Sequence, residues 1–340
     1  MHGLGDSVVD GVERDALIRW LLPLAATYRW GGRQGVDMIR PGLEGRVLVG
    51  AYESALTHPA ERIFVERLDG VPAAATILRP KPMESECFGV ATAALTPVVS
   101  APEQDDRSTV VRRLLSRVSD EAAADGVRLL ILRVDADDVG TLAAAQDVGY
   151  RVCESTTTWL GNTDAGPTPL DLPPGVRAEV HEGDFAGALS DEEVERLASL
   201  TAAWQLNHFR ADPHLSDEAV ERFYGRWVHN IASGQWSDCI VTVRHEGRLL
   251  GLASELTDRE LLDLTGTAVR VMEWLLTIER GHGTGKHLMA AAANHSFPGG
   301  TWHWWETQAR NTPTMRRVEQ TGVAIPVRSA YTLHAWPAER

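Results

Sequence analysis

The two halves of the chain repeat each other, and this repeat constrains the fold more than any single motif. Residues 136–149 (ADDVGTLAAAQDVG) align with residues 309–322 (ARNTPTMRRVEQTG) at a constant offset of 173 residues (309 − 136 = 173). An apolar strand pattern precedes each segment. A further strand follows each one and ends in Thr157–Leu160 or Tyr331–Leu333. Because the order of elements matches over the whole halves, we expect a duplicated fold rather than two unrelated units.

Hydrophobic periodicity and turn residues predict an alternation of helices and strands in both halves. In the first half we expect helices over 13–29, 105–125 and 141–147, and strands over 62–68, 71–78, 88–99, 128–134 and 152–160. In the second half we expect helices over 190–206, 217–233, 286–295 and 312–320, and strands over 176–180, 239–244, 248–256, 269–278, 301–307 and 324–335. This mixture of helices and hairpins indicates an α+β fold, with a mixed, mostly antiparallel sheet in each half.

The segment Gly161–Gly175 is rich in Gly, Pro, Thr and Asp, which is typical of a linker. It separates a predicted N-terminal domain, residues 1–160, from a predicted C-terminal domain, residues 176–340. At 340 residues the chain is long enough for two domains with separate cores.

Composition narrows the classes of function. The net charge of −14 argues against nucleic acid and anionic membranes as partners. No apolar run has the length of a membrane span, and residues 1–11 lack the regions of a signal peptide. The three cysteines are scattered and the histidines form no ligand cluster, so we expect a cytoplasmic protein without a catalytic metal. The sequence leaves a homodimer open.

The stretch Leu275–Met289 (LLTIERGHGTGKHLM) reads as a strand, a glycine-rich turn and the start of a helix. Glycines allow backbone N–H groups to converge on a ligand, and the helix that follows adds its positive N-terminal end. Such a turn is suited to a phosphate or pyrophosphate. Its spacing, Arg-x-x-Gly-x-Gly, is neither that of a Walker loop nor that of the dinucleotide fingerprint.

This strand, turn and helix, followed by a strand and by Asn311 before a short helix, resembles the GNAT acyltransferase superfamily. The match covers residues 177–340 well and residues 60–160 in degenerate form. More narrowly, the chain is similar to the TDP-fucosamine (TDP-4-amino-4,6-dideoxygalactose) N-acetyltransferases, which have a tandem layout. The segments that carry this likeness are HFRADPHL (208–215), ERFYGRWVHNIASG (221–234), RGHGTGKHLM (280–289) and TQARNTPTMRRVEQTG (307–322), with ECFGVATA (86–93) in the first half.

The resemblance implies that the second half binds acetyl-CoA or another acyl-CoA. The pyrophosphate is expected on the amides of His282 to Lys286, and the pantetheine on the open strand edge Leu276–Ile278. In the first half, the corresponding stretch Ser100–Asp106 has three acids and no glycine, so we expect one cofactor per chain. The full set of expected cofactor residues is Leu276, Thr277, Ile278, Arg280, Gly281, His282, Gly283, Thr284, Gly285, Lys286 and Asn311.

Acyl transfer to an amine requires a base for the amine and stabilisation of the thioester oxygen, here by a strand-edge amide near Leu275–Thr277. The leaving thiolate often takes a proton from a tyrosine, which in many GNAT enzymes stands seven residues after the asparagine that corresponds to Asn311. This chain has Val318 there. Three readings remain open: another donor (Tyr331, Tyr224 or His303), catalysis by proximity alone, or a site recruited to other work.

For the base, Glu273 and Glu306 are the carboxylates nearest the expected acyl position. Strand alternation is expected to place Val271, Glu273 and Leu275 on one face. The expected catalytic residues are Glu273, Tyr331 and His303. The expected substrate residues are His208, Arg210, Tyr224 and Glu306, with Arg210 as a holder of a nucleotide diphosphate.

The sequence thus favours an acyl-CoA-dependent N-acyltransferase of an amino sugar, nucleotide-linked or not, in a biosynthetic pathway. Alternatives are an acyltransferase for another small amine, of the aminoglycoside or mycothiol type, and a catalytically weakened acyl-CoA-binding protein. A different reaction on the thioester, such as hydrolysis or decarboxylation, is a further alternative.

Overall fold

The computed structural model describes residues 11–25, 37, 39, 42–101, 107–162, 170–183, 185, 187–279, 282–295, 301–322 and 324–337. Parts of the predicted helices 13–29 and 105–125, residues 163–169 of the predicted linker, and Arg280 and Gly281 lie outside these residues. None of the helices in the described ranges is long and apolar enough to cross a membrane.

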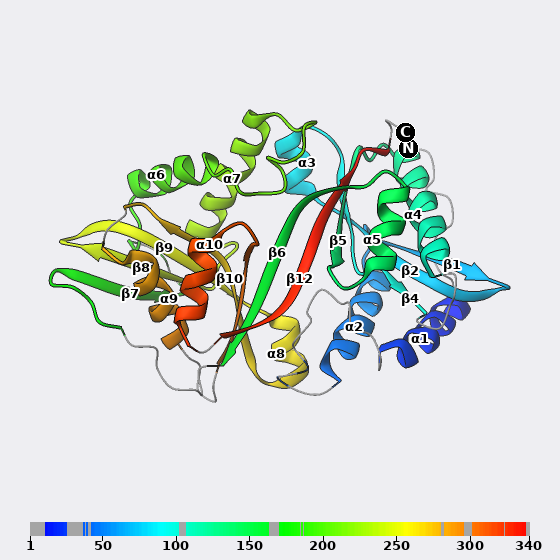
Figure 1. The fold of residues 1–340 in the computed structure, drawn as a ribbon, viewed down its shortest axis with the longest axis horizontal. Helices are drawn as coiled ribbons and strands as arrows, with labels where there is room; N and C mark the ends of the chain where they lie inside the picture. The colour runs from blue at the N-terminus through cyan, green and yellow to red at the C-terminus, as the bar shows by residue number, and fades with distance from the viewer. Residues whose placement is uncertain are drawn as a thin grey trace. The chain divides into compact units, whose positions relative to one another are not determined.

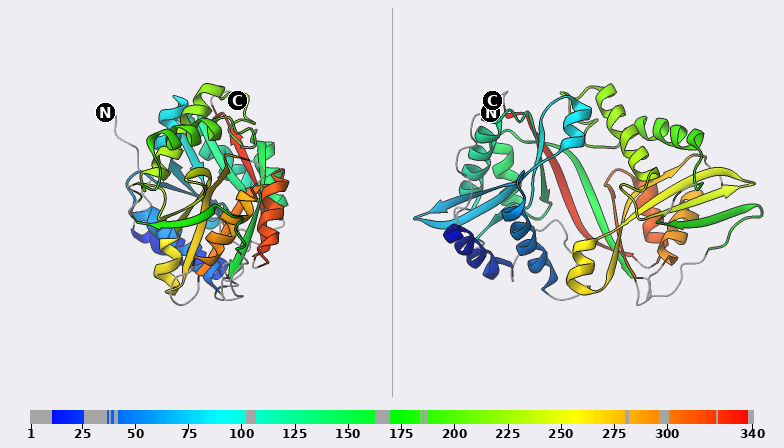
Figure 2. Two further views of the ribbon diagram at one scale, coloured as in Figure 1. Left: turned by 90° about the vertical axis from the view of Figure 1, so that its left-hand side faces the viewer. Right: turned by 180° about the vertical axis from the view of Figure 1, so that it is seen from behind.

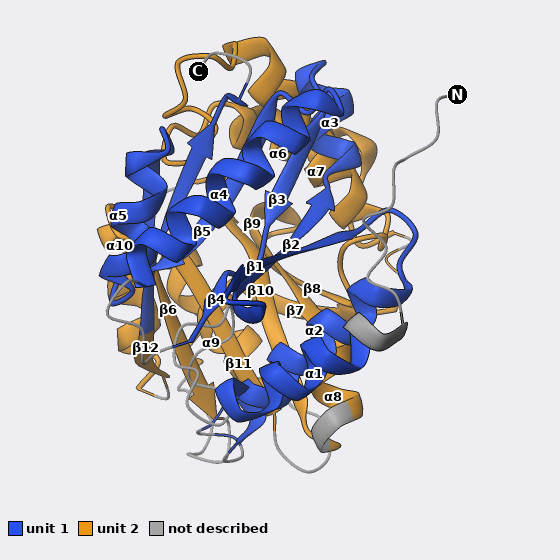
Figure 3. Cartoon of the chain, turned by 90° about the vertical axis from the view of Figure 1, so that its right-hand side faces the viewer, with its two compact units in different colours: residues 1–155, 328–340 blue, residues 156–327 orange. Residues whose placement is uncertain are grey.

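The chain forms two compact units (Figure 3). Unit 1 comprises residues 1–155 and 328–340, and unit 2 comprises residues 156–327. These boundaries fall inside two strands, β6 (Arg151–Asn162) and β12 (Ala324–Ala335), and not in the segment predicted as a linker. The last residues of the chain therefore belong to unit 1, although the sequence places them in the C-terminal domain.

Unit 1 has the strand order β1-β2-β3-β5-β12, with β4 paired to β2. All neighbours are antiparallel except β3 and β5. Its elements, besides β6 and β12, are α1 (Gly11–Ala25), α2 (Leu43–Thr57), β1 (Arg62–Leu68), β2 (Val71–Pro80), α3 (Pro82–Phe88), β3 (Thr92–Leu95), β4 (Val99–Ser100), α4 (Arg107–Ala124), β5 (Leu129–Asp135) and α5 (Val139–Asp147).

Unit 2 has the strand order β6-β11-β10-β9-β8-β7, in which only β10 and β11 are parallel. Its elements are β7 (Val176–Glu182), α6 (Asp191–Ala202), α7 (Asp217–Ala232), β8 (Cys239–His245), β9 (Arg248–Thr257), α8 (Arg259–Thr265), β10 (Ala268–Thr277), α9 (Thr284–Asn294), β11 (Thr301–Gln308) and α10 (Thr312–Gln320). The labels appear in Figure 1.

Most expected elements are confirmed, with three helices missed and one strand wrong. Helices α2, α3 and α8 were not predicted. The expected strand over 88–99 is wrong: α3 ends at Phe88, Gly89 terminates it in a left-handed conformation (φ 71°), and only Thr92–Leu95 forms the strand. The hydrophobic pattern of the sequence does not reveal α3, because this helix has only seven residues and lies between two buried strands.

The internal repeat is confirmed at the level of element bounds. Helices α5 and α10 begin and end 173 residues apart, as do β6 and β12. Both helices are N-capped by the residue before them, Asp138 or Asn311. The final strand of each half is exchanged, however: β6 pairs with β11 over Thr156–Asn162, and β12 pairs with β5 over Ala330–Ala335.

The sheet of unit 2 is covered on both faces (Figures 1 and 2). On one face, Ile240, Leu252 and Trp274 pack with residues of α6 and α7. On the other face, the residues next to them in β8 and β9 pack with Leu288, Ala291 and Ala292 of α9. A smaller cluster continues this second face toward α10 and consists of Trp159, Met289, Ala293, Trp305 and Val318, with Met272, Leu275, Met315 and Ala324 at its edge. We call this the Trp159–Trp305 cluster.

The exchanged strand gives a test of the units. Trp159 is 1% exposed and lies in the core of unit 2, although the sequence assigns it to the N-terminal domain. We expect Trp159→Ala to lower the free energy of unfolding by about 3–5 kcal/mol, as for other buried tryptophans. Hydrogen exchange followed by mass spectrometry should show lost protection in β11 and α10. Loss confined to β5 and α4 would contradict the exchange of strands, and Leu130→Ala in β5 is the matched control.

Candidate active site

The site begins where two parallel strands separate. Strands β10 and β11 pair from Ala268 with Thr301 as far as Met272 with Trp305. Beyond this last pair, β10 continues beside β9 to Thr277, and β11 continues beside β6 to Gln308. The two strands therefore form a fork, and β10 has one edge without a strand neighbour beyond Met272.

Glu273 is the bulge residue at this fork. In the pairing of β10 with β9, Met272 is opposite Glu255 and Trp274 is opposite Ser254, which leaves Glu273 without a partner. Simple alternation, which would place Met272 and Leu275 on opposite faces, does not hold across this bulge, because the extra residue shifts the pleat. Met272 and Leu275 pack together beside the Trp159–Trp305 cluster, and Trp274 packs on the opposite face.

The open edge of β10 offers backbone amides. The N–H of Ile278 is taken, because it donates to the carbonyl of Leu250 in β9 at 2.7 Å. Successive N–H groups of a strand point to opposite edges, so the N–H of Thr277 points to the open edge. Within the predicted edge Leu276–Ile278, Thr277 thus directs its N–H to the open side, while the N–H of Ile278 is bound to β9. The pairing of this edge with a pantetheine arm stays a prediction.

The glycine turn ends in a helix start that has unused amides. Gly283 is in the left-handed conformation (φ 68°) and caps α9 without a side-chain hydrogen bond. The first helical bond is donated by His287 to the Gly283 carbonyl, so the amides of Thr284, Gly285 and Lys286 have no partner within the helix. Thr284 is 3% exposed, and its Oγ1 has no hydrogen-bond partner among the described residues.

The approach of α9 to the sheet depends on a glycine in β9. A Cβ atom on Gly251 would lie 2.6 Å from the Leu276 carbonyl oxygen and 2.8 Å from Cγ2 of Thr284. Only glycine therefore lets the start of α9 lie directly against β10. His287 is buried behind the turn. Its pKa is lowered, because burial disfavours the charged ring and Lys286 lies nearby.

A groove of about 440 Å³ runs between these elements. Its volume is within the usual range for small-molecule sites. The lining residues are Leu275, Thr277, Glu279, Gly283, Thr284, Gly285, Met289, Pro313, Thr314 and Arg317. Four of them are predicted cofactor residues: Thr277, Gly283, Thr284 and Gly285. Among the α10 residues, the sequence suggests Arg317 as a phosphate neighbour, whereas Pro313 and Thr314 were not predicted as site residues, although positions 313, 314 and 317 mark one helical face.

The other predicted cofactor residues have different places. Lys286 is exposed and does not line the groove, and the His282 ring lies 5.1 Å from the His245 ring, centroid to centroid. Asn311 caps α10: its Oδ1 accepts from the Thr314 N–H at 3.4 Å, and its Nδ2 donates to Thr307 at 3.0 Å. Asn311 thus fixes the start of the helix that forms one wall of the groove.

Two carboxylates stand next to each other at the fork. Glu273 and Glu306 each follow the last residue pair of β10 and β11, Met272 and Trp305. Glu306 accepts a hydrogen bond from Thr158 Oγ1 at 3.0 Å. The pKa of Glu273 is raised to about 7, first because protein around the carboxyl disfavours its charged form and then because Glu306 is negative. The Glu273 side chain is nevertheless exposed, and it is not among the residues that line the groove.

His303 lies in a buried polar cluster. It is 1% exposed, its Nδ1 is 3.2 Å from Oε1 of the fully buried Glu255, and its ring stacks on Trp305. Arg270, also 1% exposed, pairs with Glu255 and with Glu182. Among the described residues, His303 therefore serves this ionic cluster and is not a wall of the groove.

Val318 faces the protein interior. It is 1% exposed and packs in the Trp159–Trp305 cluster, while Thr314 and Arg317 of the same helix line the groove. The position at which the resemblance implies a tyrosine acid is here part of the core of unit 2.

The predicted substrate residues of the α6–α7 loop are largely engaged in structure. Arg210 binds the carboxylates of Asp217 and Glu221, and its Nη2 donates to the Ala202 carbonyl at 2.7 Å. These contacts hold the loop to α6 and α7. Tyr224 is buried in a chain of edge-to-face aromatic contacts that reaches Trp274 through Trp227. The ring centroid of His208 lies 3.9 Å from that of Phe209.

Tyr331 belongs to unit 1. It lies opposite Val134 in the pairing of β12 with β5 and packs against the core of that unit. The exchange of final strands, which the sequence does not reveal, is the reason for this placement.

Unit 1 differs from unit 2 at the position that corresponds to the groove. Arg107 at the start of α4 donates to Asp138, the cap of α5, at 2.8 Å and to Ser100 at 2.6 Å. A direct ion pair thus joins the starts of the two helices, whose counterparts in unit 2 border the groove.

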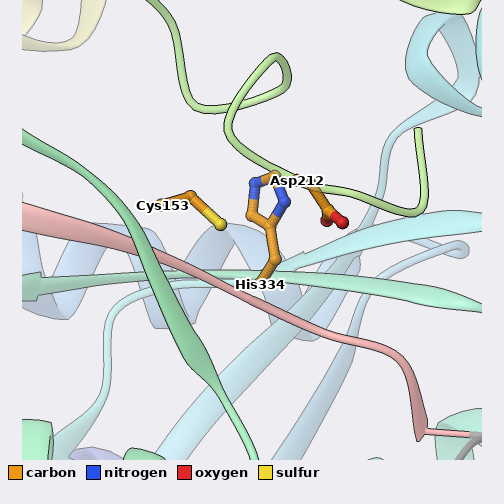
Figure 4. Close-up of side chains that lie close together, drawn as sticks. All are labelled: Cys153, Asp212 and His334. Carbon is orange, nitrogen blue, oxygen red and sulfur yellow. The ribbon is translucent and has the colours of Figure 1, made fainter. Parts of the chain in front are cut away.

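Figure 4 labels three side chains of metal-ligating type, Cys153, Asp212 and His334. Cys153 and His334 belong to unit 1, and Asp212 belongs to unit 2, where it accepts a hydrogen bond from the His214 N–H at 3.0 Å. Catalytic zinc sites use three protein ligands. Over the described residues, neither unit on its own brings three such side chains together. The expectation of no metal stays a prediction.

No protein-family model matches the chain, and no curated protein matches it in sequence. Solved structures do match. A tandem GNAT protein from the clavulanic acid biosynthesis pathway has a TM-score of 0.54 and 18% identity over 97% of each chain. A GCN5-related N-acetyltransferase from Sphaerobacter thermophilus has a TM-score of 0.54 and 12% identity over 95% of this chain and 92% of that one. At such identities the likeness shows the fold alone. The chain has a tandem GNAT fold of the α+β class, as predicted.

The contact at Gly251 yields a prediction for the groove. We expect Gly251→Ala to push the start of α9 away from β10, to cost about 1–3 kcal/mol of folding free energy through overpacking, and to weaken acetyl-CoA binding. Chemical denaturation and calorimetric titration would measure the two effects. Gly225→Ala in α7 is the matched control, because a Cβ there meets nothing within 4 Å. Equal behaviour of the two variants would contradict the role of Gly251.

Proposed function

We propose that the protein is an acyl-CoA-dependent N-acyltransferase, with acetyl-CoA as the first acyl donor to test. The observation that carries this proposal is the fork of β10 and β11. It joins, in one unit, an open strand edge, a groove that ends at an uncapped helix start, and an exposed carboxyl with a raised pKa.

The residues of the groove fit the chemical parts of an acyl-CoA. The amides of Thr284 to Lys286 and the Thr284 hydroxyl would hold the diphosphate, since a helix start favours negative charge. Arg317 on the opposite wall adds a positive charge. The Thr277 amide on the open edge would bind the extended amide arm, as in the addition of a strand. Acyl-CoA supplies the activated thioester, and the chain supplies its orientation.

Glu273 is the proposed general base. An amine must lose its proton before it can attack a carbonyl, and a base works best when its pKa is near the working pH. A pKa of about 7 meets this condition. The bulge aims Glu273 out of the regular pleat at the point where the strands separate.

For the acceptor we propose a small amine, with amino sugars first on the panel and their TDP-linked forms included. The carboxylates Glu273 and Glu306 favour an acceptor that arrives as an ammonium ion. Arg210 was expected to bind the diphosphate of a nucleotide-linked sugar, but its guanidinium already pairs with Asp217 and Glu221. A pathway role in amino-sugar biosynthesis is part of this proposal and rests on the resemblance in sequence.

A second candidate function is an acyl-CoA-binding protein with little turnover. The burial of Val318 favours it, because the position of the tyrosine acid has been absorbed into the core. Incubation with acetyl-CoA and the amine panel, with free thiol measured, separates the two candidates. Thiol release that depends on an amine supports the transferase, whereas binding without release supports the second candidate.

The base assignment predicts a pH profile. With Glu273 as the base, kcat/KM should rise with pH through about 7, and Glu273→Gln should lower it about 100- to 10,000-fold and remove this limb. Glu306→Gln is the matched control: loss of the neighbouring negative charge should move the limb to lower pH and leave it in place. A limb near 7 that persists in Glu273→Gln would contradict the assignment.

The same raised pKa predicts a change in stability. Between the ordinary carboxyl value of 4.5 and about 7, the unfolded chain has released the Glu273 proton while the folded protein retains it. The free energy of unfolding contributed by this group therefore falls as the pH rises through this window. Thermal melts should show Glu273→Gln to be more stable than the natural protein at pH 8 and no more stable at pH 4. The reverse order would contradict it.

A further inference from the structure

We propose that the indole N–H of Trp305 donates a hydrogen bond to the sulfur of the acyl donor and stabilises the leaving thiolate. This inference rests on the proposed function, and it assigns the role for which the sequence offers no tyrosine. It is carried by the position of Trp305 at the fork and by the state of its Nε1 atom.

Trp305 stands at the closed end of the fork. It is opposite Met272 in the last residue pair before β10 and β11 separate. It packs with Met289 and Leu275, which also line the groove. The Trp305 side chain thus shares a cluster with two residues of the groove wall, on the face of the sheet covered by α9 and α10.

The Nε1 atom of Trp305 has no hydrogen-bond partner among the described residues, and the residue is only 2% exposed. A buried donor without a partner is costly and uncommon in folded proteins. Tryptophans placed purely for packing usually find an acceptor for this group. An acceptor delivered by a ligand would explain why the donor is kept.

Val318 connects this observation to the chemistry. It packs in the same cluster as Trp305, and it stands where the resemblance places a tyrosine acid. A donor in this cluster therefore lies beside the position from which the family's hydroxyl would act.

Trp159 shares the cluster and also has an Nε1 atom without a partner in the described residues. It lies on β6, on the far side of β11 from the fork, because Trp305 is opposite Trp159 in the pairing of these two strands. The register therefore assigns the role to Trp305 and makes Trp159 the natural control.

The step balances without an additional acid. The amine nitrogen forms a bond to the acyl carbon, and the carbon–sulfur bond breaks with its electron pair going to sulfur. The acceptor nitrogen, which arrives as an ammonium ion, loses two protons: one passes to solvent before the attack, and the second passes to the Glu273 carboxylate as the amide forms. The Trp305 N–H donates a hydrogen bond to the thiolate and keeps its own proton. A thiol of pKa about 8.5 is a weak enough acid that the thiolate later takes a proton from Glu273 or solvent near neutral pH.

The test observes the indole directly. The protein, with its 11 tryptophans labelled with ¹⁵N, is titrated with CoA and with desulfo-CoA, which lacks only the sulfur. We expect the Trp305 indole N–H resonance to move downfield with CoA and not with desulfo-CoA. Trp305→Phe identifies the resonance, and conventional assignment through neighbouring residues replaces it where this variant does not fold.

Kinetics give the second readout. Trp305→Phe should lower kcat about 10- to 100-fold, the range of a hydrogen bond to a charged group, and change the Kd for acetyl-CoA less than threefold. Trp159→Phe should leave kcat within threefold.

Two failures are distinguishable. Binding of CoA and desulfo-CoA with equal effects on the Trp305 resonance would overturn this inference and leave the proposed function intact. No binding of either ligand, with the glycine-turn resonances unmoved, would overturn both.

Discussion

The structure of unit 2 depends on one departure from regular pairing, the bulge at Glu273. The bulge adds one residue to β10 after its last pairing with β11, and the two strands then follow different neighbours. A β-bulge bends its strand and increases the local twist. The open edge, the groove and the exposed carboxyl are therefore three consequences of one extra residue. Gly251 completes the arrangement, because it lets α9 close over β10 without a steric clash.

The features of the site lie on different faces of the sheet of unit 2. The groove and the Trp159–Trp305 cluster are on the side of α9 and α10. Trp274 packs toward α6 and α7 on the other face. Because side chains alternate along a strand, Glu306 points to the face opposite that of its neighbour Trp305. Glu306 and the groove therefore lie on opposite faces of the sheet.

The sequence predicted the repeat, most element bounds and the glycine turn, because each depends on local pattern. Gly149 and Gly322, one in each half, both adopt positive φ at the same point of the repeat. The exchange of β6 and β12 could not be predicted, since two copies of one strand fit either partner equally well by pattern. Tyr331 was therefore placed in the wrong unit, and Trp159 likewise. The bulge at Glu273 could not be predicted either, because one extra residue does not visibly change the hydrophobic pattern of a strand as short as Ala268–Thr277.

The replacement of tyrosine by Val318 is consistent with the packing around it. Trp159 and Trp305 bring two large rings into the space between α9, α10 and the sheet, and a third large ring at position 318 would have to share that space. Valine is the size that the tryptophans leave. The two tryptophans that leave room for valine also bring buried indole N–H donors into this cluster. On the proposal made above, a fixed N–H of this kind would stabilise a thiolate with little reorganisation until it takes a proton.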